Sequence, residues 1–237
     1  IAGVYPPASV FKLVTSGAGL EHGLLSVNKY YPHLCDGGYR FGNRYQKCWG
    51  VHGNLNVVNA LRLSCDVYFY QAGLEIDMER INEFGRRFGL GEEVLGIDIP
   101  GERRGWLPDS ASFNKRNKRS GWRWARGLIL NLSIGQGQLV TPLQQAVLVG
   151  SLATNAGVYK PHLMKELRDR SGKKKKKFEP EIIRSGQMKE STHKVILAGL
   201  DSVVNHPGGT GKRGAVKGIR VGGKTGSGEW KKGEKTH

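Results

Sequence analysis

The chain has 237 residues, of which 38% are hydrophobic and 24% charged, a composition typical of a folded globular protein. An excess of lysine and arginine gives a formal net charge of +17, concentrated in residues 101–126, 160–177 and 212–235. Three separate basic patches favour a protein that works beside an anionic surface, and they argue against a nucleic-acid partner, whose recognition motifs are absent. No run of about 18 apolar residues exists, so no segment is expected to span a membrane.

The first half of the chain predicts three helices around an irregular loop. Pro6 and Pro7 favour a helix start, because a first turn does not need the donor that proline lacks, and a helix is expected over residues 8–18. Residues 30–54 show no regular periodicity and are expected to form a structured loop or small subdomain. Apolar residues recur at helical spacing within two further ranges, which predicts helices over 56–73 and 77–88.

The second half predicts two more helices. Residues 98–126 are expected to form an extended, basic, aromatic loop. Thr141 has the chemistry of a helix cap and Pro142 that of a first helical residue, which predicts a helix over 143–154. A further helix is expected over 192–204.

Strand signals come late in the chain. The lysine run 173–177 is expected to be a solvated loop tip that joins two strands. Residues 214–228 alternate glycine, basic and apolar residues, which predicts a strand with close backbone neighbours. Mostly helical order with late strands indicates an α+β fold.

The spacing Ser9-x-x-Lys12 places a hydroxyl and an amine on one face of the first predicted helix. An amine whose pKa is lowered by burial there takes the proton of the hydroxyl, which makes the serine a nucleophile. The same spacing occurs five times in the chain, so the pattern alone is weak. The two preceding prolines and the apolar neighbours distinguish Ser9.

Two further motifs follow in a fixed order. Ser64-x-Asp66 supplies a second hydroxyl with a polar partner, and Lys224-Thr225-Gly226 occurs only once in the chain. The ordered set S-x-x-K, S-x-[ND] and K-T-G is the signature of penicillin-binding proteins and serine β-lactamases.

The chain resembles the transpeptidase domain of class B penicillin-binding proteins, and among them the elongation-type penicillin-binding protein 2. The similar text covers residues 5–12, 53–71, 133–146 and 223–226. The resemblance implies the penicillin-binding and serine β-lactamase-like fold, helix-rich and α+β, with a central antiparallel sheet that is incomplete in this chain. It makes residues 1–237 a partial transpeptidase domain, with the anchor and dimerisation regions before it and further strands after it.

The resemblance also implies an enzyme of the serine-type D-Ala-D-Ala transpeptidase and carboxypeptidase class. Ser9 would attack a peptidoglycan stem peptide that ends in D-Ala-D-Ala, with Lys12 as base. Ser64 would relay the proton to the leaving amine, and Asp66 would hold the surrounding hydrogen bonds. The substrate-binding set would be Lys224 and Thr225 on the terminal carboxylate, Gly226 for close backbone approach, and the backbone N–H groups of Ser9 and Ser227 as oxyanion hole.

The same resemblance places the protein on the periplasmic or extracytoplasmic face of the bacterial cell membrane, anchored by a segment outside this chain. It implies a role in cell-wall elongation and cell shape, β-lactams as inhibitors, a glycan polymerase as partner, and no cofactor for catalysis. A β-lactamase or β-lactam sensor shares the triplet, but the class A deacylation loop text E-x-x-x-N is absent between Asp66 and Lys224. A non-catalytic basic scaffold that binds anionic envelope components is the remaining alternative.

The three cysteines and one histidine suggest a metal site. Cys35, Cys48, His52 and Cys65 form a Cys3His set, which is a common closed zinc site, and elongation-type relatives resemble this in sometimes carrying zinc near the same place. The alternative is a Cys35–Cys48 disulfide with Cys65 buried and free, which suits an oxidising compartment.

Overall fold

Helices dominate the structure, a computed structural model that describes residues 1–231 and 234–236. The helical elements are η1 Ala8–Phe11, α1 Lys12–Glu21, α2 Val57–Arg62, α3 Asp66–Ile76, α4 Met78–Arg87, α5 Ser110–Arg116, η2 Lys118–Ser120, α6 Leu128–Ser133, α7 Pro142–Thr154, α8 Glu190–Asn205 and η3 Lys212–Gly214. The strands are β1 Gly38–Phe41, β2 Arg44–Lys47, β3 Val158–Tyr159, β4 Glu166–Arg168, β5 Lys174–Lys177, β6 Ile182–Arg184, β7 Gly228–Lys231 and β8 Glu234–Thr236. Among the described residues none of the helices is both long and apolar enough to cross a lipid bilayer.

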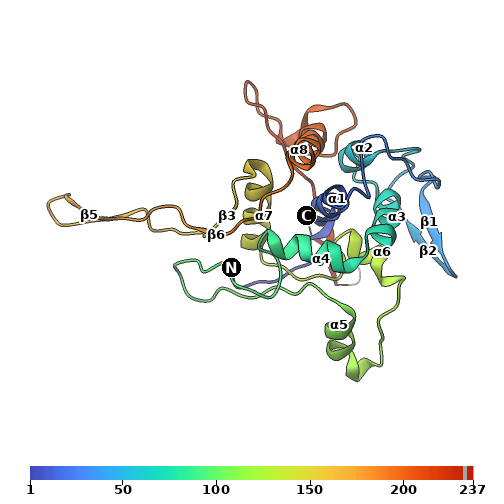
Figure 1. Ribbon diagram of the computed structural model, residues 1–237, viewed down its shortest axis with the longest axis horizontal. Helices are drawn as coiled ribbons and strands as arrows, with labels where there is room; N and C mark the ends of the chain where they lie inside the picture. The colour runs from blue at the N-terminus through green and yellow to red at the C-terminus, as the bar shows by residue number, and fades with distance from the viewer. Residues whose placement is uncertain (232–233, 237) are drawn as a thin grey trace.

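Helix α1 is the centre of the fold, with α2, α3, α4 and α8 around it (Figure 1). Every residue from 12 to 19 is buried, so α1 presents no polar face to water. Close packing against it needs small residues. A Cβ added at Gly17 would lie 2.2 Å from Phe84 Cζ of α4, so glycine at that position lets the two helices approach.

The strands pair as four separate two-stranded antiparallel sheets, in the orders β1-β2, β3-β6, β4-β5 and β7-β8. The described residues therefore contain no continuous central sheet. Helices with small antiparallel sheets confirm the α+β prediction.

The predicted helices are present, with one of them divided. The 8–18 prediction corresponds to η1 and α1, and α7 begins at Pro142 with Thr141 and Gln144 in a capping box. The 77–88 and 192–204 predictions correspond to α4 and α8. The expected helix over 56–73 is two helices, α2 and α3, because the chain turns at Ser64.

The prediction of an extended loop over residues 98–126 was wrong in its middle, where α5 forms. A capping box starts α5: the Asp109 side chain accepts from the Ser112 N–H at 2.7 Å, and Ser112 Oγ accepts from the Asp109 N–H at 3.1 Å. No residue of α5 is buried, so the helix has no apolar stripe to reveal it in the sequence.

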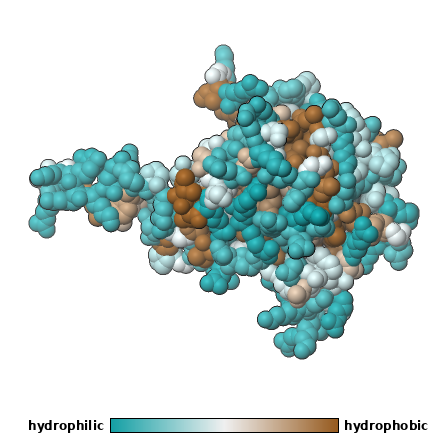
Figure 2. Space-filling view, in the orientation of Figure 1, coloured by the Kyte–Doolittle hydropathy of each residue, from teal (hydrophilic) through white to brown (hydrophobic). Residues whose placement is uncertain are grey.

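The lysine run forms a strand and not the tip of a loop. Four of its lysines form β5, which pairs with β4, and the turn lies at residues 169–173. Ion pairs join Lys174 to Glu166 (3.4 Å) and Lys175 to Asp169 (3.3 Å). The run is exposed, as expected, on an arm that projects from the body and is largely hydrophilic on the face that Figure 2 shows.

The strand predicted over residues 214–228 is also absent. Residues 220–227 form no regular ladder, and β7 begins only at Gly228. A strand exists only where a neighbour accepts and donates its backbone hydrogen bonds, and within the described part of the chain residues 220–227 have no paired strand. The K-T-G residues therefore lie in irregular backbone.

Gly135 fixes the turn in which η1 begins. Its carbonyl oxygen accepts from the Ala8 N–H at 3.1 Å, and its φ is +82°. A Cβ there would lie 2.1 Å from the Ala8 carbonyl oxygen, so the contact requires glycine.

We expect Gly135→Ala to lower the free energy of unfolding by about 2 kcal/mol or more, because the added methyl meets backbone and the φ is left-handed. Urea denaturation measures this. Gly150→Ala is the matched control: Gly150 lies inside α7 with nothing within 4 Å of an added Cβ, so alanine should stabilise by about 1 kcal/mol. Equal effects of the two substitutions would contradict the assignment of Gly135 to a tight contact.

Candidate active site

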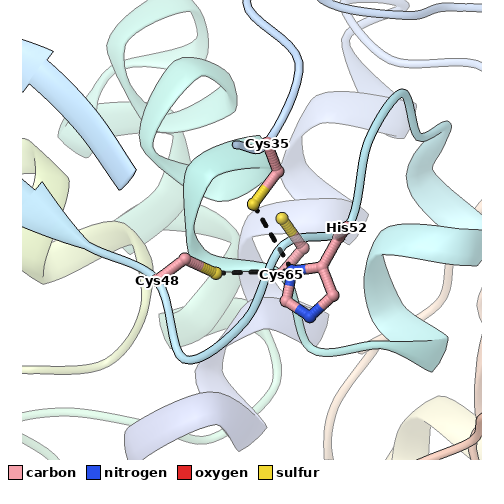
Figure 3. Close-up of side chains that lie close together, drawn as sticks. All are labelled: Cys35, Cys48, His52 and Cys65. Atoms are coloured by element: carbon pink, nitrogen blue, oxygen red, sulfur yellow. Dashed lines mark hydrogen bonds between the residues drawn. The ribbon is translucent and has the colours of Figure 1, made fainter. Parts of the chain in front are cut away.

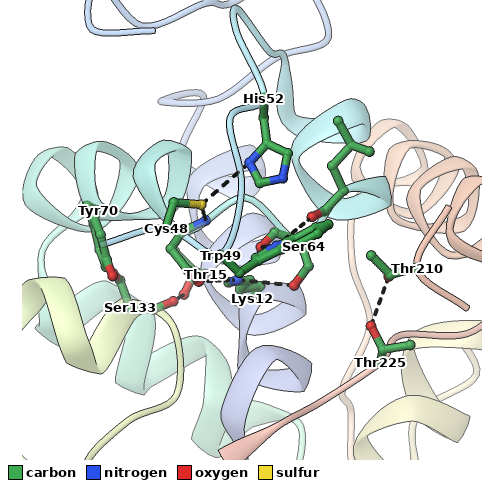
Figure 4. Close-up of polar contacts among 12 residues, drawn as sticks. Lys12, Thr15, Cys48, Trp49, His52, Ser64, Tyr70, Ser133, Thr210 and Thr225 are labelled. Carbon is green, nitrogen blue, oxygen red and sulfur yellow. Dashed lines mark hydrogen bonds and ion pairs between the residues drawn. The ribbon is translucent and has the colours of Figure 1, made fainter. Parts of the chain in front are cut away.

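The ammonium group of Lys12 is the centre of the polar cluster in Figure 4. The Lys12 side chain is completely buried at the start of α1. Its Nζ donates to the Ser64 carbonyl oxygen (2.8 Å), to Ser64 Oγ (3.1 Å) and to Asp66 Oδ1 (2.6 Å). These acceptors match the three donors of an ammonium group, and the carboxylate balances its charge.

Ser64 occupies a left-handed position at the end of α2, with φ +51°. The Ser64 N–H donates to the Leu61 carbonyl (3.1 Å) and the Cys65 N–H to the Ala60 carbonyl (3.0 Å). This pair of bonds is a Schellman motif, in which glycine usually takes the left-handed residue. Asp66 then begins α3, so one turn places both polar residues of the second motif beside Lys12.

The K-T-G segment contacts the same cluster. Lys224 Nζ donates to Ser64 Oγ at 2.9 Å and to the Thr225 carbonyl at 3.1 Å, so Ser64 Oγ lies between two lysine amines. Burial, and then the charge of Lys12, hold the pKa of Lys224 well below its usual range, while Asp66 acts in the opposite direction. The folded site therefore favours the charged form of this amine less than water does.

Ser9 lies in η1, three residues before Lys12, and is half-buried. Within the described part of the chain its hydroxyl has no hydrogen-bond partner. Gly226 lies against the same turn, because a Cβ there would be 3.3 Å from Val10 Cγ2 and 3.7 Å from the Pro7 carbonyl oxygen. Ser227 follows as an exposed residue. The contacts of Gly226 with this turn and the hydrogen bonds of Ser64 with Lys12 and Lys224 bring all three motifs together at the start of α1.

Sequence reasoning missed two neighbours of this cluster. Thr210 Oγ1 lies 2.9 Å from Thr225 Oγ1, and Trp49 donates from its indole to the turn that carries Ser64. Thr210 had no signal except a glycine-rich stretch that precedes the K-T-G motif. Trp49 lies between Cys48 and His52 in the sequence, and this position is what could have indicated that it lies near the second motif.

The Cys3His set comes together as the spacing suggested (Figure 3). The ligand atoms of Cys35, Cys48, His52 and Cys65 lie within 4.8 Å of one another. Cys35 Sγ and Cys48 Sγ each lie 3.4 Å from His52 Nδ1. All three cysteines are free thiols in the structure, so the Cys35–Cys48 disulfide is not present.

Two of the ligand-atom separations in this set can be compared with those of a tetrahedral zinc site. Zinc–sulfur and zinc–nitrogen bonds of about 2.3 and 2.0 Å at a tetrahedral angle separate the two ligand atoms by about 3.5 Å. The observed sulfur–nitrogen separations of 3.4 Å agree with that value. Hydrogen bonds from Cys65 and from backbone N–H groups lower the pKa of the Cys48 thiol, which favours its thiolate. Burial raises the pKa of the Cys35 thiol, and the interaction with Cys48 followed by burial raises that of Cys65.

This cluster is attached directly to the second motif. Cys65 follows Ser64 in the chain, and Cys48 Sγ accepts a hydrogen bond from the Asp66 N–H at 3.3 Å. Any group that holds the four ligands together therefore also holds the turn that carries Ser64 and Asp66.

The chain matches the family model of the penicillin-binding protein transpeptidase domain over residues 1–237. It is 32% identical over 215 residues to the peptidoglycan D,D-transpeptidase MrdA of Escherichia coli K12, covering 88% of this chain and 32% of that protein. It is 31% identical over 226 residues to stage V sporulation protein D of Bacillus subtilis, covering 94% of this chain and 32% of that protein. The chain thus spans about a third of the length of these relatives.

Among solved structures, the chain is similar to the penicillin-binding protein PBP2 of Helicobacter pylori in complex with MreC. The TM-score is 0.79 at 30% identity, covering 94% of this chain and 39% of that one. The fold prediction drawn from the resemblance is confirmed by this similarity.

The lowered pKa of Lys224 makes stability depend on pH. In an unfolded chain a lysine titrates near pH 10.4, so between the depressed folded pKa and that value the unfolded state binds more protons. The contribution of Lys224 to the free energy of unfolding should therefore rise with pH across this window, and the difference in stability between the wild type and Lys224→Met should show it. Urea titrations of both proteins measure it, with the exposed Lys217→Met as control. If the free energy of unfolding of the wild type does not increase with pH relative to that of Lys224→Met, the lowered pKa of Lys224 is wrong.

Proposed function

The chain belongs to the penicillin-binding protein transpeptidase domain family, and on that premise we propose that it supplies the catalytic domain of a peptidoglycan D,D-transpeptidase. The observation that carries the proposal is the hydrogen-bonded set of Lys12, Ser64, Asp66 and Lys224 beside the turn that holds Ser9. Residues from three distant parts of the sequence supply the hydroxyls, amines and carboxylate that acyl transfer to serine needs.

In the proposed reaction Ser9 Oγ attacks the carbonyl of the penultimate D-alanine of a stem peptide. Lys12 takes the serine proton, and Ser64 Oγ, which lies between Lys12 and Lys224, passes a proton to the nitrogen of the departing D-alanine. The acyl-serine then reacts with an acceptor amine, which forms the cross-link and frees Ser9. The backbone N–H groups of Ser9 and Ser227 would stabilise the oxyanion.

Lys12 must release its charge to act as a base. Lys12 Nζ forms a buried ion pair with Asp66 and donates to Ser64 Oγ, the atom to which Lys224 Nζ also donates. The substrate carboxylate would bind at Lys224 and Thr225, and Gly226 leaves room for the substrate backbone beside η1. Binding of that carboxylate adds a negative charge to the site.

We also propose a structural zinc ion at Cys35, Cys48, His52 and Cys65. Four protein ligands leave no open position, so the metal would hold the loop over 35–53 against the second motif and would take no part in catalysis. The proposed setting is the extracytoplasmic face of the cell membrane, with an anchor outside this chain and a glycan polymerase as partner. The Helicobacter pylori relative in complex with MreC supports a protein that works within an assembly.

Ser9 is expected to be the acylated residue. Benzylpenicillin incubated with the full-length protein should add its mass to the peptide that contains Ser9, and Ser9→Ala should show no adduct by mass spectrometry. Ser64→Ala should slow acylation by about a hundredfold or more while the adduct still maps to Ser9, because only proton transfer is lost. An adduct at Ser64, or one that survives Ser9→Ala, would overturn the assignment.

The control for that experiment is the projecting lysine strand. Replacement of all five lysines at 173–177 by serine should leave the acylation rate unchanged at moderate salt, because exposed charges beyond about 10 Å are screened. A large fall in the acylation rate would show that the lysine strand takes part in acylation.

Metal analysis tests the zinc proposal. We expect one zinc per chain by elemental analysis and three alkylatable thiols after denaturation with chelator. Chelation should lower the thermal unfolding temperature, because metal binding is coupled to folding, and Cys35→Ser should lower the zinc content in the same way. No metal together with a single free thiol would support the disulfide instead.

A further inference from the structure

The indole of Trp49 donates to the two backbone carbonyls around the second-motif serine. Trp49 Nε1 lies 3.0 Å from the Leu63 carbonyl oxygen and 3.2 Å from that of Ser64 (Figure 4). Trp49 is 62% exposed, so it contributes little to the core, and two hydrogen bonds join its indole to the turn.

The two carbonyls need an external donor. They lie at the end of α2, where helix carbonyls have no N–H group of their own helix to accept from. Within the described part of the chain, the Leu63 carbonyl has no donor other than Trp49. The Ser64 carbonyl shares its two lone pairs between Trp49 and Lys12.

The loop that carries Trp49 contacts both the first and the last residue of the second motif, Ser64 and Asp66. Cys48 Sγ accepts from the Asp66 N–H, while Trp49, the next residue, donates to the Ser64 carbonyl. The Trp49 ring also lies 4.7 Å from the His52 ring, which orients the indole. The loop thus holds the turn from the N–H side and from the C=O side.

Rotation of the Ser64 peptide would move Ser64 Oγ away from one of its two amines. Ser64 has a left-handed φ, which costs free energy for a residue with a Cβ and is maintained only by surrounding contacts. The Trp49 bonds restrain this peptide directly, without using the Lys12 ammonium.

We propose that Trp49 is a positioning residue for acylation: its indole N–H holds the Ser64 peptide so that Ser64 Oγ stays between Lys12 and Lys224. The inference rests on the proposed transpeptidase function and adds a residue to it. Because Trp49 lies in the loop of the Cys3His set, it also connects that loop to the proton path.

The test replaces the N–H group alone. The full-length protein carries β-(3-benzothienyl)alanine at position 49, in which sulfur replaces the indole N–H and the ring shape is kept. Stopped-flow binding of a fluorescent penicillin separates the dissociation constant from the first-order acylation constant. We expect the acylation constant to fall about two- to tenfold, the range of one lost hydrogen bond, with the dissociation constant unchanged. Trp49→Phe should behave in the same way.

Trp122 is the matched control, since its side chain is 60% exposed and the same replacement there should change neither constant. Zinc content and unfolding temperature should equal those of the wild type, which excludes a general loss of structure. A position-49 isostere that acylates at the wild-type rate overturns the proposal.

An activity-free measurement separates the two hypotheses. Hydrogen exchange of the indole N–H, followed by NMR, should be slower for Trp49 than for Trp122. Equal exchange overturns the positioning role even where acylation at Ser9 is observed. Slow exchange in a wild-type protein that is never acylated overturns the transpeptidase function, and with it any role of Trp49 in acylation.

Discussion

A buried lysine ammonium that must keep three acceptors is the constraint on which the site depends. Lys12 is completely buried, and such a charge is tolerated only with a carboxylate and full hydrogen bonding around it. Ser64 and Asp66 meet that demand from one turn, and this turn forms only where α2 stops and α3 starts. Loss of one partner of such a pair costs about 3–5 kcal/mol, so the arrangement of Lys12, Ser64 and Asp66 is also part of the stability of the fold.

The loop over residues 35–53 acts on that turn from outside the core. The sulfur of Cys48 accepts from the Asp66 N–H, and the indole of Trp49 donates to the Ser64 carbonyl. The ligand atoms of Cys35, Cys48 and His52 also lie within 4.8 Å of the Cys65 sulfur. Few of its side chains are buried, so the core alone does little to fix it. These contacts order the turn that carries Ser64 and Asp66 without enlarging the hydrophobic core.

The sequence predicted the elements whose start signals are local. Thr141, Pro142 and an apolar face were enough for α7, and the cysteine spacing brought out the Cys3His set. Helix α5 was missed because it buries no residue and has no apolar periodicity. The break at Ser64 was missed because a left-handed serine has no glycine to mark it. Trp49 could not be found by pattern, since its two hydrogen bonds are to backbone atoms that are identical in every residue.

The left-handed backbone of Ser64 restricts how this position changes during evolution. Glycine and asparagine adopt that φ most readily, whereas β-branched threonine, the other small hydroxyl residue, is strained there. Glycine or asparagine at position 64 would keep the backbone conformation but lose the hydroxyl. Threonine would keep the hydroxyl but strain the backbone. Few single substitutions at position 64 therefore keep both the backbone conformation and a side-chain hydroxyl.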